Sequence, residues 1–129
     1  MKQLNEQQII ENWTQFSNLV ETTFTGDRKA ALMKLVEHFQ DRMMLAPASS
    51  KEHYHGAHPG GYMEHVLNVY NIAMDLFEVW EKYSNVIDYT PEEITLVTLF
   101  HDLGKMGDIT EEFYYRIYFL MVKKYTKNM

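Results

Sequence analysis

The sequence predicts an all-α domain, a compact bundle of about five helices. Apolar residues recur three or four positions apart through most of the chain, and no segment alternates convincingly as a strand does. The 129 residues allow one hydrophobic core and are too few for two ordinary domains. We therefore expect a single helical domain over 1–129, in which 1–45 form a scaffold, 46–108 carry the chemical motifs and 109–129 form a last helix.

The amino-terminal scaffold is predicted to contain two amphipathic helices. From Leu4 to Phe24 the apolar residues follow helical spacing, and Asn5 with Gln8 has the pattern of a capping box. A break at 25–27 follows, where Asp27 is placed to cap the second helix. The buried stripe of that second helix is expected to comprise Leu32, Leu35, Val36, Phe39 and Met43.

Two more helices are predicted downstream. The longest covers 62–83, and a shorter one begins at Thr90, which precedes a proline at the first helical position and a glutamate at the third. Ile94, Val97 and His101 share one face of the shorter helix, so we expect His101 to point to the same side as the core. The buried face of the longest helix is expected to comprise Val66, Val69, Tyr70, Ala73, Phe77 and Trp80.

Composition narrows the classes of function. The formal net charge of −6 argues against general nucleic-acid binding, which usually shows a basic excess. The absence of cysteine excludes thiolate ligands, so any metal would be bound by histidine and carboxylate side chains. The amino terminus lacks the apolar core of a signal peptide, and no apolar run approaches the roughly 20 residues of a membrane span. We expect a cytoplasmic protein that does not contact membranes.

The segment 98–105 concentrates the chemistry, because an apolar helical run ends there in His101, Asp102, a glycine and Lys105. Asp102 lies close in the chain to Leu99, Phe100 and Leu103. We therefore expect its carboxylate to be partly desolvated and to need a cation or several donors. A divalent metal shared with His101 would meet that need. Two ligands cannot hold a metal, so further ligands must come from elsewhere in the chain.

His101 lies 36 residues after His65, which itself follows a Gly-Gly pair at 60–61. The combination resembles the HD-domain superfamily of metal-dependent phosphohydrolases. The resemblance covers roughly 46–108. It implies the compact HD helical bundle and a divalent metal ion, one of Mn, Fe, Mg, Co, Ni or Zn. It also implies that His65, His101 and Asp102 are metal ligands, that Asp102 is catalytic, and that a distant aspartate supplies a fourth ligand.

The loop 45–61 is the one long stretch without a helical or strand period, and loops of this length tend to be functional or disordered. His55 with the glycines at 56, 60 and 61 resembles a lead-in found in many HD proteins, although Gly56 stands where a second histidine is common. His55 then either contacts a substrate phosphate or binds a second metal, or else it is a solvated loop residue. For His53 and His58 we favour the solvated loop.

Two features of the motif stay open. By resemblance Lys105 contacts a substrate phosphate and assists catalysis, whereas its simpler role is a solvated cation at the carbonyl end of a helix. The fourth ligand has no good candidate: Asp108 lies too close to Asp102, and Glu111 and Glu112 are explained as first-turn acids of the last helix. We expect a three-ligand site, open on one side, with weak metal binding and slow hydrolysis, as though the ligand-bearing region were absent.

The sequence as a whole predicts a metal-dependent phosphohydrolase that acts on a nucleotide or another phosphate ester through metal-activated water. The main alternative is a catalytically weak or silent HD-like domain that binds a nucleotide or a protein partner. A third is a purely structural bundle, in which the His-Asp pair is a satisfied polar cluster. The expected partner is a small phosphorylated molecule; no nucleic acid is expected, and a homo-oligomer is compatible with the sequence.

Overall fold

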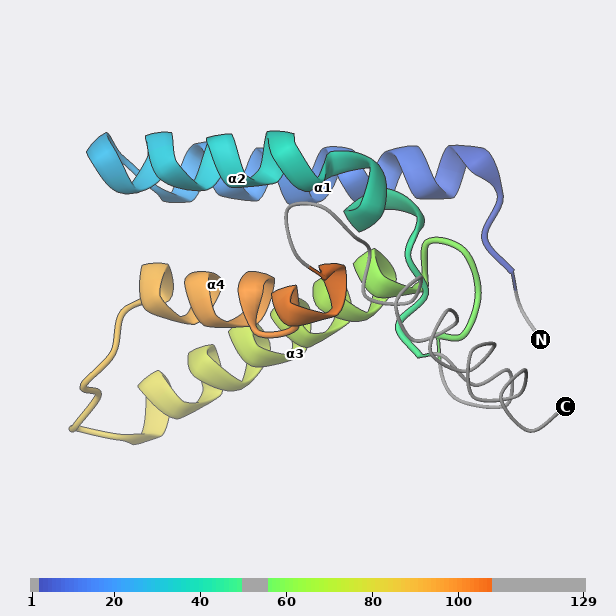
Figure 1. The fold of residues 1–129 in the computed structure, drawn as a ribbon. Coiled ribbons are helices and arrows are strands. Elements are labelled where there is room, and N and C mark those ends of the chain that lie inside the picture. The colour runs from blue at the N-terminus through green and yellow to red at the C-terminus, as the bar shows by residue number, and fades with distance from the viewer. Residues whose placement is uncertain (1–2, 50–55, 108–129) are drawn as a thin grey trace, which may run out of the picture.

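A computed structural model describes residues 3–49 and 56–107, and in these ranges the chain forms two helical hairpins and no strand. The first hairpin pairs α1 (Glu6–Thr23) with α2 (Gly26–Leu45), and the second pairs α3 (Gly61–Tyr83) with α4 (Pro91–Phe100). The first hairpin forms one layer and the second forms another below it, with α4 nearly parallel to α2 (Figure 1). A 3₁₀ turn, η1, covers Leu103–Met106. The all-α prediction is confirmed; the predicted last helix, 109–129, lies outside the described residues.

Local capping signals explain where two of the four described helices begin. Asn5 and Gln8 form the predicted capping box of α1, and Thr90 accepts a hydrogen bond from a first-turn N–H of α4. The prediction that Asp27 caps α2 was wrong. Thr25 occupies the cap position without a side-chain cap bond, and Asp27 lies in the first turn, where its charge favours the positive end of the helix dipole.

The core lies where the two hairpins meet. Phe16 of α1 stands edge-on to Phe100 of α4 with 5.9 Å between ring centroids, and Leu99 beside Phe100 is fully buried. Each such buried side chain stabilises the fold by roughly 1.5–3 kcal/mol. The fully buried large side chains are Tyr62, Phe16, Phe24, Met43, Met63, Leu99, Met106, Val20 and Val66.

The expected inner face of α4 was wrong. Thr95 and Leu99 face the core, whereas Val97 is 65% exposed. Successive helical residues are about 100° apart, so Val97 lies about 200° from Thr95 and cannot share its face. Thr95 is tolerated inside because its hydroxyl donates to the Pro91 carbonyl at 2.8 Å.

The expected inner face of α3 was only partly right. Val66 and Phe77 are buried, but Trp80 is 57% exposed, because the C-terminal half of α3 slopes away from α1 and α2 (Figure 1). Within the described ranges, no helix is both long enough and apolar enough to cross a membrane.

Candidate metal centre

Three side chains converge where the start of α3 meets the turn after α4. His65 Nε2 lies 3.1 Å from Asp102 Oδ2, and His101 Nε2 lies 3.4 Å from the same oxygen. One ligand atom from each residue lies within 4.8 Å of the others. The antiparallel pairing of α3 and α4 produces this arrangement, because it brings the second turn of α3 beside the residues that follow α4 (Figure 1).

The His101 ring has a fixed orientation and tautomer. Its Nδ1 lies 2.7 Å from the Thr98 carbonyl oxygen. Because a carbonyl only accepts, Nδ1 must carry the proton and donate. In the neutral ring the lone pair is then on Nε2, which faces Asp102 Oδ2. Nε2 and Asp102 Oδ2 lie 3.4 Å apart, so both can be ligands of one cation.

The donor set and the two distances to Asp102 suit a divalent cation. Two imidazoles and one carboxylate are ligands that Zn, Mn, Fe, Co and Ni accept. Ligand atoms at about 2.1 Å from a metal lie about 3.4 Å apart in a tetrahedron and about 3.0 Å apart when adjacent in an octahedron. The distances of 3.1 and 3.4 Å that end on Asp102 Oδ2 fall in that range. Among residues 3–49 and 56–107, no fourth histidine or carboxylate joins the group.

Asp102 is partly desolvated, as the sequence predicts, and it also faces the ammonium group of Lys105. Its side chain is 22% exposed, and Lys105 Nζ lies 3.5 Å from Oδ2. The same ammonium donates to the Ala48 carbonyl at 2.9 Å. Lys105 therefore links the turn after α4 to the loop that follows α2. Among residues 3–49 and 56–107, these two contacts leave one of its three N–H donors for another acceptor. Its predicted contact with a substrate phosphate stays a prediction.

The turn that carries Asp102 is also held in place by Met106 and Arg42. Met106, the last residue of η1, is fully buried, and its carbonyl accepts a hydrogen bond from Arg42 Nη1 at 3.2 Å. Gly107 then leaves the turn with φ of 83°, which favours glycine. Asp102 therefore sits on a segment held by packing and by a charged donor.

The loop before α3 approaches its own backbone closely. The Ala48 N–H donates to the Gly56 carbonyl at 2.8 Å, and the Tyr62 N–H donates to the Ala46 carbonyl at 3.0 Å. A Cβ atom on Gly61 would lie only 2.0 Å from the Gly56 oxygen. Gly61 is thus required for the start of α3 to pack against this loop, and that packing sets the position of His65. His53 and His55 lie in 50–55, outside the described residues.

His58 was expected to be a solvated loop residue, and that expectation was wrong. Its side chain is 7% exposed, and Nε2 lies 3.5 Å from a carboxylate oxygen of Glu64. The His58 carbonyl accepts from the Gly61 N–H at 2.9 Å, so a tight turn directs the ring inward. The Pro-Gly-Gly run after His58 was a signal for that turn, although it did not indicate burial.

The fold and this cluster together define an all-α protein with a His-His-Asp centre of metal-ligand type. Comparisons with protein-family models, with curated proteins and with solved structures gave no match. The resemblance to the HD superfamily therefore rests on the chain's own residues and stays a prediction.

Proposed function

We propose that the chain binds a divalent metal ion through His65, His101 and Asp102 and hydrolyses a phosphate ester, with a nucleotide as the expected class of substrate. The observation that carries the proposal is that Nε2 of His65 and Nε2 of His101 both face Asp102 Oδ2. His65 comes from a different helix than the other two residues, so their meeting is a result of the fold. When bound, such a cation polarises a phosphoryl oxygen and activates a water molecule for attack on phosphorus. The nucleotide preference follows from the HD resemblance alone.

Each residue of the site has a distinct role in this proposal. Asp102 supplies the negative charge that attracts the cation, because its Oδ2 faces Nε2 of both histidines. Thr98 holds His101 so that Nε2 faces the centre. Lys105, whose ammonium lies beside Asp102, neutralises charge on the phosphoryl oxygens as the ester is cleaved.

A second function is favoured by one observation, the limit of three ligands among the described residues. A three-ligand site binds metal more weakly than a closed one, and a weakly held cation gives slow hydrolysis. The alternative is therefore a catalytically weak or silent HD-like domain that binds a nucleotide or a protein partner. Rapid turnover would exclude it, and metal or nucleotide binding without turnover would favour it.

Metal analysis of protein purified without added metal, followed by calorimetric titration with Mn²⁺ and Zn²⁺, tests the proposal. His65→Ala and Asp102→Ala should each reduce metal affinity by at least ~10-fold, while the helical circular dichroism stays unchanged because the helices rest on their apolar faces. His38→Ala is the control, since His38 is an exposed histidine of α2. Unchanged affinity in both site variants would contradict the metal assignment.

A screen of phosphomonoesters and phosphodiesters with the metal-loaded protein tests the reaction. Lys105→Ala should reduce turnover more than metal affinity, because a protonated ammonium binds phosphate and cannot ligate a metal. Lost metal with intact nucleotide binding would contradict that role. Tight metal binding with rapid turnover by the unmodified chain would show that a residue outside the described ranges, such as Asp108 or His55, completes the site.

A further inference from the structure

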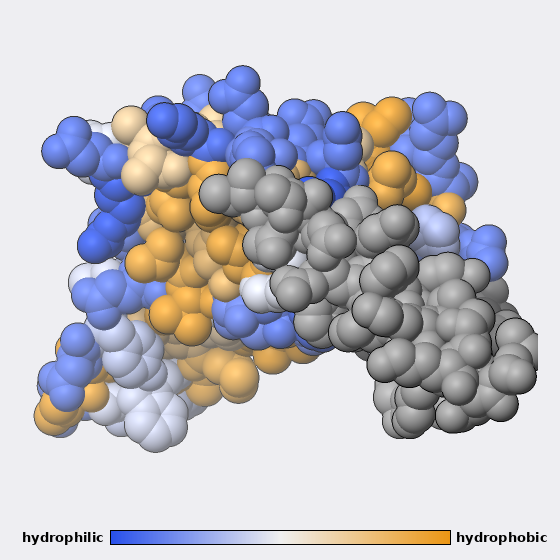
Figure 2. All heavy atoms as spheres, in the orientation of Figure 1, coloured by the Kyte–Doolittle hydropathy of each residue, from blue (hydrophilic) through white to orange (hydrophobic). Residues whose placement is uncertain are grey.

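The C-terminal half of α3 exposes a continuous row of large apolar side chains. Ile72, Leu76, Val79 and Tyr83 are between 56% and 79% exposed. We call these four residues the outer stripe. Figure 2 shows that hydrophobic residues also gather over α4 and continue onto α3. Scattered single apolar residues on a surface are ordinary, but a continuous row on one helix indicates an interaction site.

The outer stripe has the spacing of a coiled-coil seam. Its members follow one another at intervals of four, three and four residues, which is the a/d pattern of two heptads. Amphipathic core helices usually show a broader apolar face. The narrow seam lies away from the buried residues Val66 and Phe77 of the same helix. The stripe is therefore shaped for another helix rather than for the chain's own core.

The stripe is complementary to itself when two copies of α3 run antiparallel. With Leu76 opposite Val79 of a second copy, Ile72 falls opposite Tyr83, and the two-fold axis repeats both pairs. Each layer then combines a larger side chain with a smaller one, which fills the space between helix axes. An arrangement in which each residue meets its own partner again by symmetry is an isologous interface.

The flanking charges match the same antiparallel register. Asp75 precedes Leu76 and Lys82 precedes Tyr83, so both occupy the g positions that flank the seam. In the antiparallel pair each Asp75 lies beside Lys82 of the second copy, and the ion pair forms twice. Lys82 Nζ already lies over the Tyr83 ring, 5.6 Å from its centroid, which keeps the ammonium at the edge of the stripe. A parallel pair would place Asp75 beside Trp80 instead.

The exposed indole of Trp80 would contact the second copy in the same antiparallel pair. Trp80 and Ala73 occupy the e positions, which face each other across an antiparallel seam. Ala73 borders a groove of about 260 Å³ between α3 and α4. The indole of one copy therefore lies beside the groove of the other. The groove is lined by Ala73, Leu76, Phe77, Trp80, Tyr89 and Ile94.

We propose that the protein forms a two-fold symmetric dimer through the C-terminal halves of two antiparallel α3 helices. The interface centres between Leu76 and Val79 and is oriented by the Asp75–Lys82 pairs. It begins at Ile72, about 10 Å along the helix from His65. Both His-His-Asp clusters therefore stay outside the seam, and the dimer does not depend on the proposed hydrolase activity.

Sedimentation over a range of concentrations tests the assembly itself. The full chain should sediment as a species of twice its 15.3 kDa mass. Leu76→Glu should yield monomer with unchanged circular dichroism, because the replaced side chain is already exposed. Val97→Glu on α4 is the matched control, with nearly the same exposure but off the stripe, and it should stay dimeric. A wild-type monomer at every concentration overturns the proposal, including the case in which residues beyond 107 cover the stripe.

Charge exchange tests the orientation. Asp75→Lys and Lys82→Asp should each weaken the dimer at least ~10-fold, because like charges then face each other twice. The double variant restores opposite charges and should recover most of the affinity. If both single variants dimerise more weakly and the double variant does not recover the affinity, the antiparallel register is overturned.

Cross-linking gives an independent reading of the orientation, since the chain has no cysteine of its own. Leu76→Cys and Val79→Cys are prepared separately and then mixed with a short bifunctional maleimide. The antiparallel dimer predicts that the mixture cross-links faster than either variant alone. Faster linkage within the Leu76→Cys sample would indicate a parallel pair and overturn the proposed dimer.

Discussion

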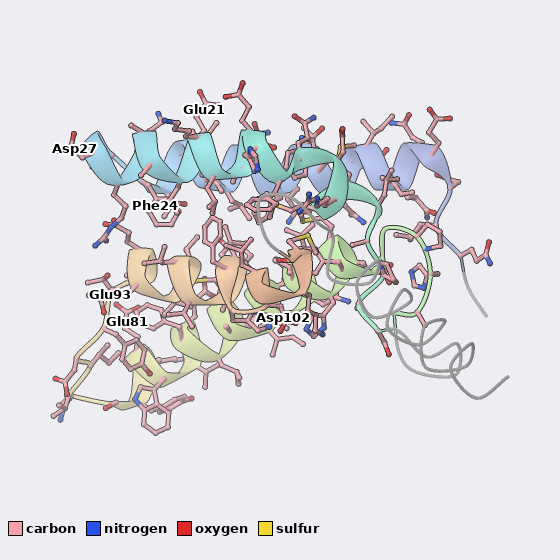
Figure 3. All side chains as sticks on the ribbon, viewed as in Figure 1. Glu21, Phe24, Asp27, Glu81, Glu93 and Asp102 are labelled. Atoms are coloured by element: carbon pink, nitrogen blue, oxygen red, sulfur yellow. The ribbon has the colours of Figure 1, made fainter. Side chains whose placement is uncertain are left out.

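The two ends of the α3–α4 hairpin differ in how their side chains are engaged. At the end that holds Asp102, polar groups from α3, from the turn after α4 and from the loop after α2 contact one another. At the opposite end, where Glu81 and Glu93 lie, apolar side chains of α3 face solvent (Figure 3). The first end is fixed by many contacts within the chain, whereas the second has apolar surface left over for another molecule. One hairpin thus carries the candidate metal site at one end and the proposed dimer surface at the other.

The largest expected loss of stability comes from a substitution at the end of the hairpin that holds Asp102. Gly61→Ala places a Cβ atom 2.0 Å from the Gly56 oxygen, and neither backbone can move without breaking the loop. We expect the free energy of unfolding to fall by about 3 kcal/mol, as in severe overpacking, and urea denaturation measures it. Gly104→Ala is the control, since nothing lies within 4 Å of its added Cβ. Equal stability of the two variants would show that the loop does not pack as described.

Metal binding should stabilise the end of the hairpin that holds Asp102. At about 100 times the dissociation constant, a ligand specific for the native state raises the free energy of unfolding by about 2.7 kcal/mol. Wild-type protein should gain this stability on addition of metal, and Asp102→Asn should gain almost none. Calorimetric melting with and without metal measures the difference. An equal gain in Asp102→Asn would mean that the metal binds elsewhere.

The link between Lys105 and the loop should contribute less. Lys105→Met removes the hydrogen bond to the Ala48 carbonyl and the ion pair with Asp102, while much of the aliphatic stem is kept. The side chain is 35% exposed, so solvent screening limits the loss to about 1 kcal/mol. Chemical denaturation in the absence of metal tests this. A loss as large as that of Gly61→Ala would show that Lys105 is a main structural support.

The smallest effect is expected at the opposite end. Arg28 of α2 and Glu92 of α4 form an ion pair at 3.2 Å, but both side chains are about half exposed. Arg28→Gln should change the free energy of unfolding by less than about 0.5 kcal/mol. A larger, salt-sensitive loss in urea denaturation would mean that this end, too, is held by polar contacts.

Local signals in the sequence predicted the helices better than their environments. The side chains of Asn5 and Thr90 cap the first turns of α1 and α4. Interactions between residues near in sequence were therefore sufficient to predict where these helices begin. Trp80 and Val97 have the right spacing for a buried face, but burial depends on which neighbouring helix covers that face. Spacing along one helix carries no information about its neighbours, and both residues proved to be exposed.

The candidate site shows the same division. His65, His101 and Asp102 could be singled out from their motif, and the structure places them together. The supports of the site could not be predicted, because Lys105 reaches Ala48 across 57 residues and Arg42 reaches Met106 across 64. The burial of His58 likewise depends on the packing of the loop against the start of α3. Such long-range contacts leave no periodic trace in a single sequence.

The paired stems of the loop after α2 have a consequence for how the protein can be engineered and can diverge. Backbone hydrogen bonds from Ala48 to Gly56 and from Tyr62 to Ala46 close the loop at its base. Both bonds are made by residues outside 50–55, so the start of the helix that carries His65 is held from either side of that segment. Closure entropy rises slowly with the number of residues between two joined points, by about 0.6 kcal/mol for each doubling. Lengthening the chain between Ala48 and Gly56 should therefore leave His65 and Asp102 in their relative positions.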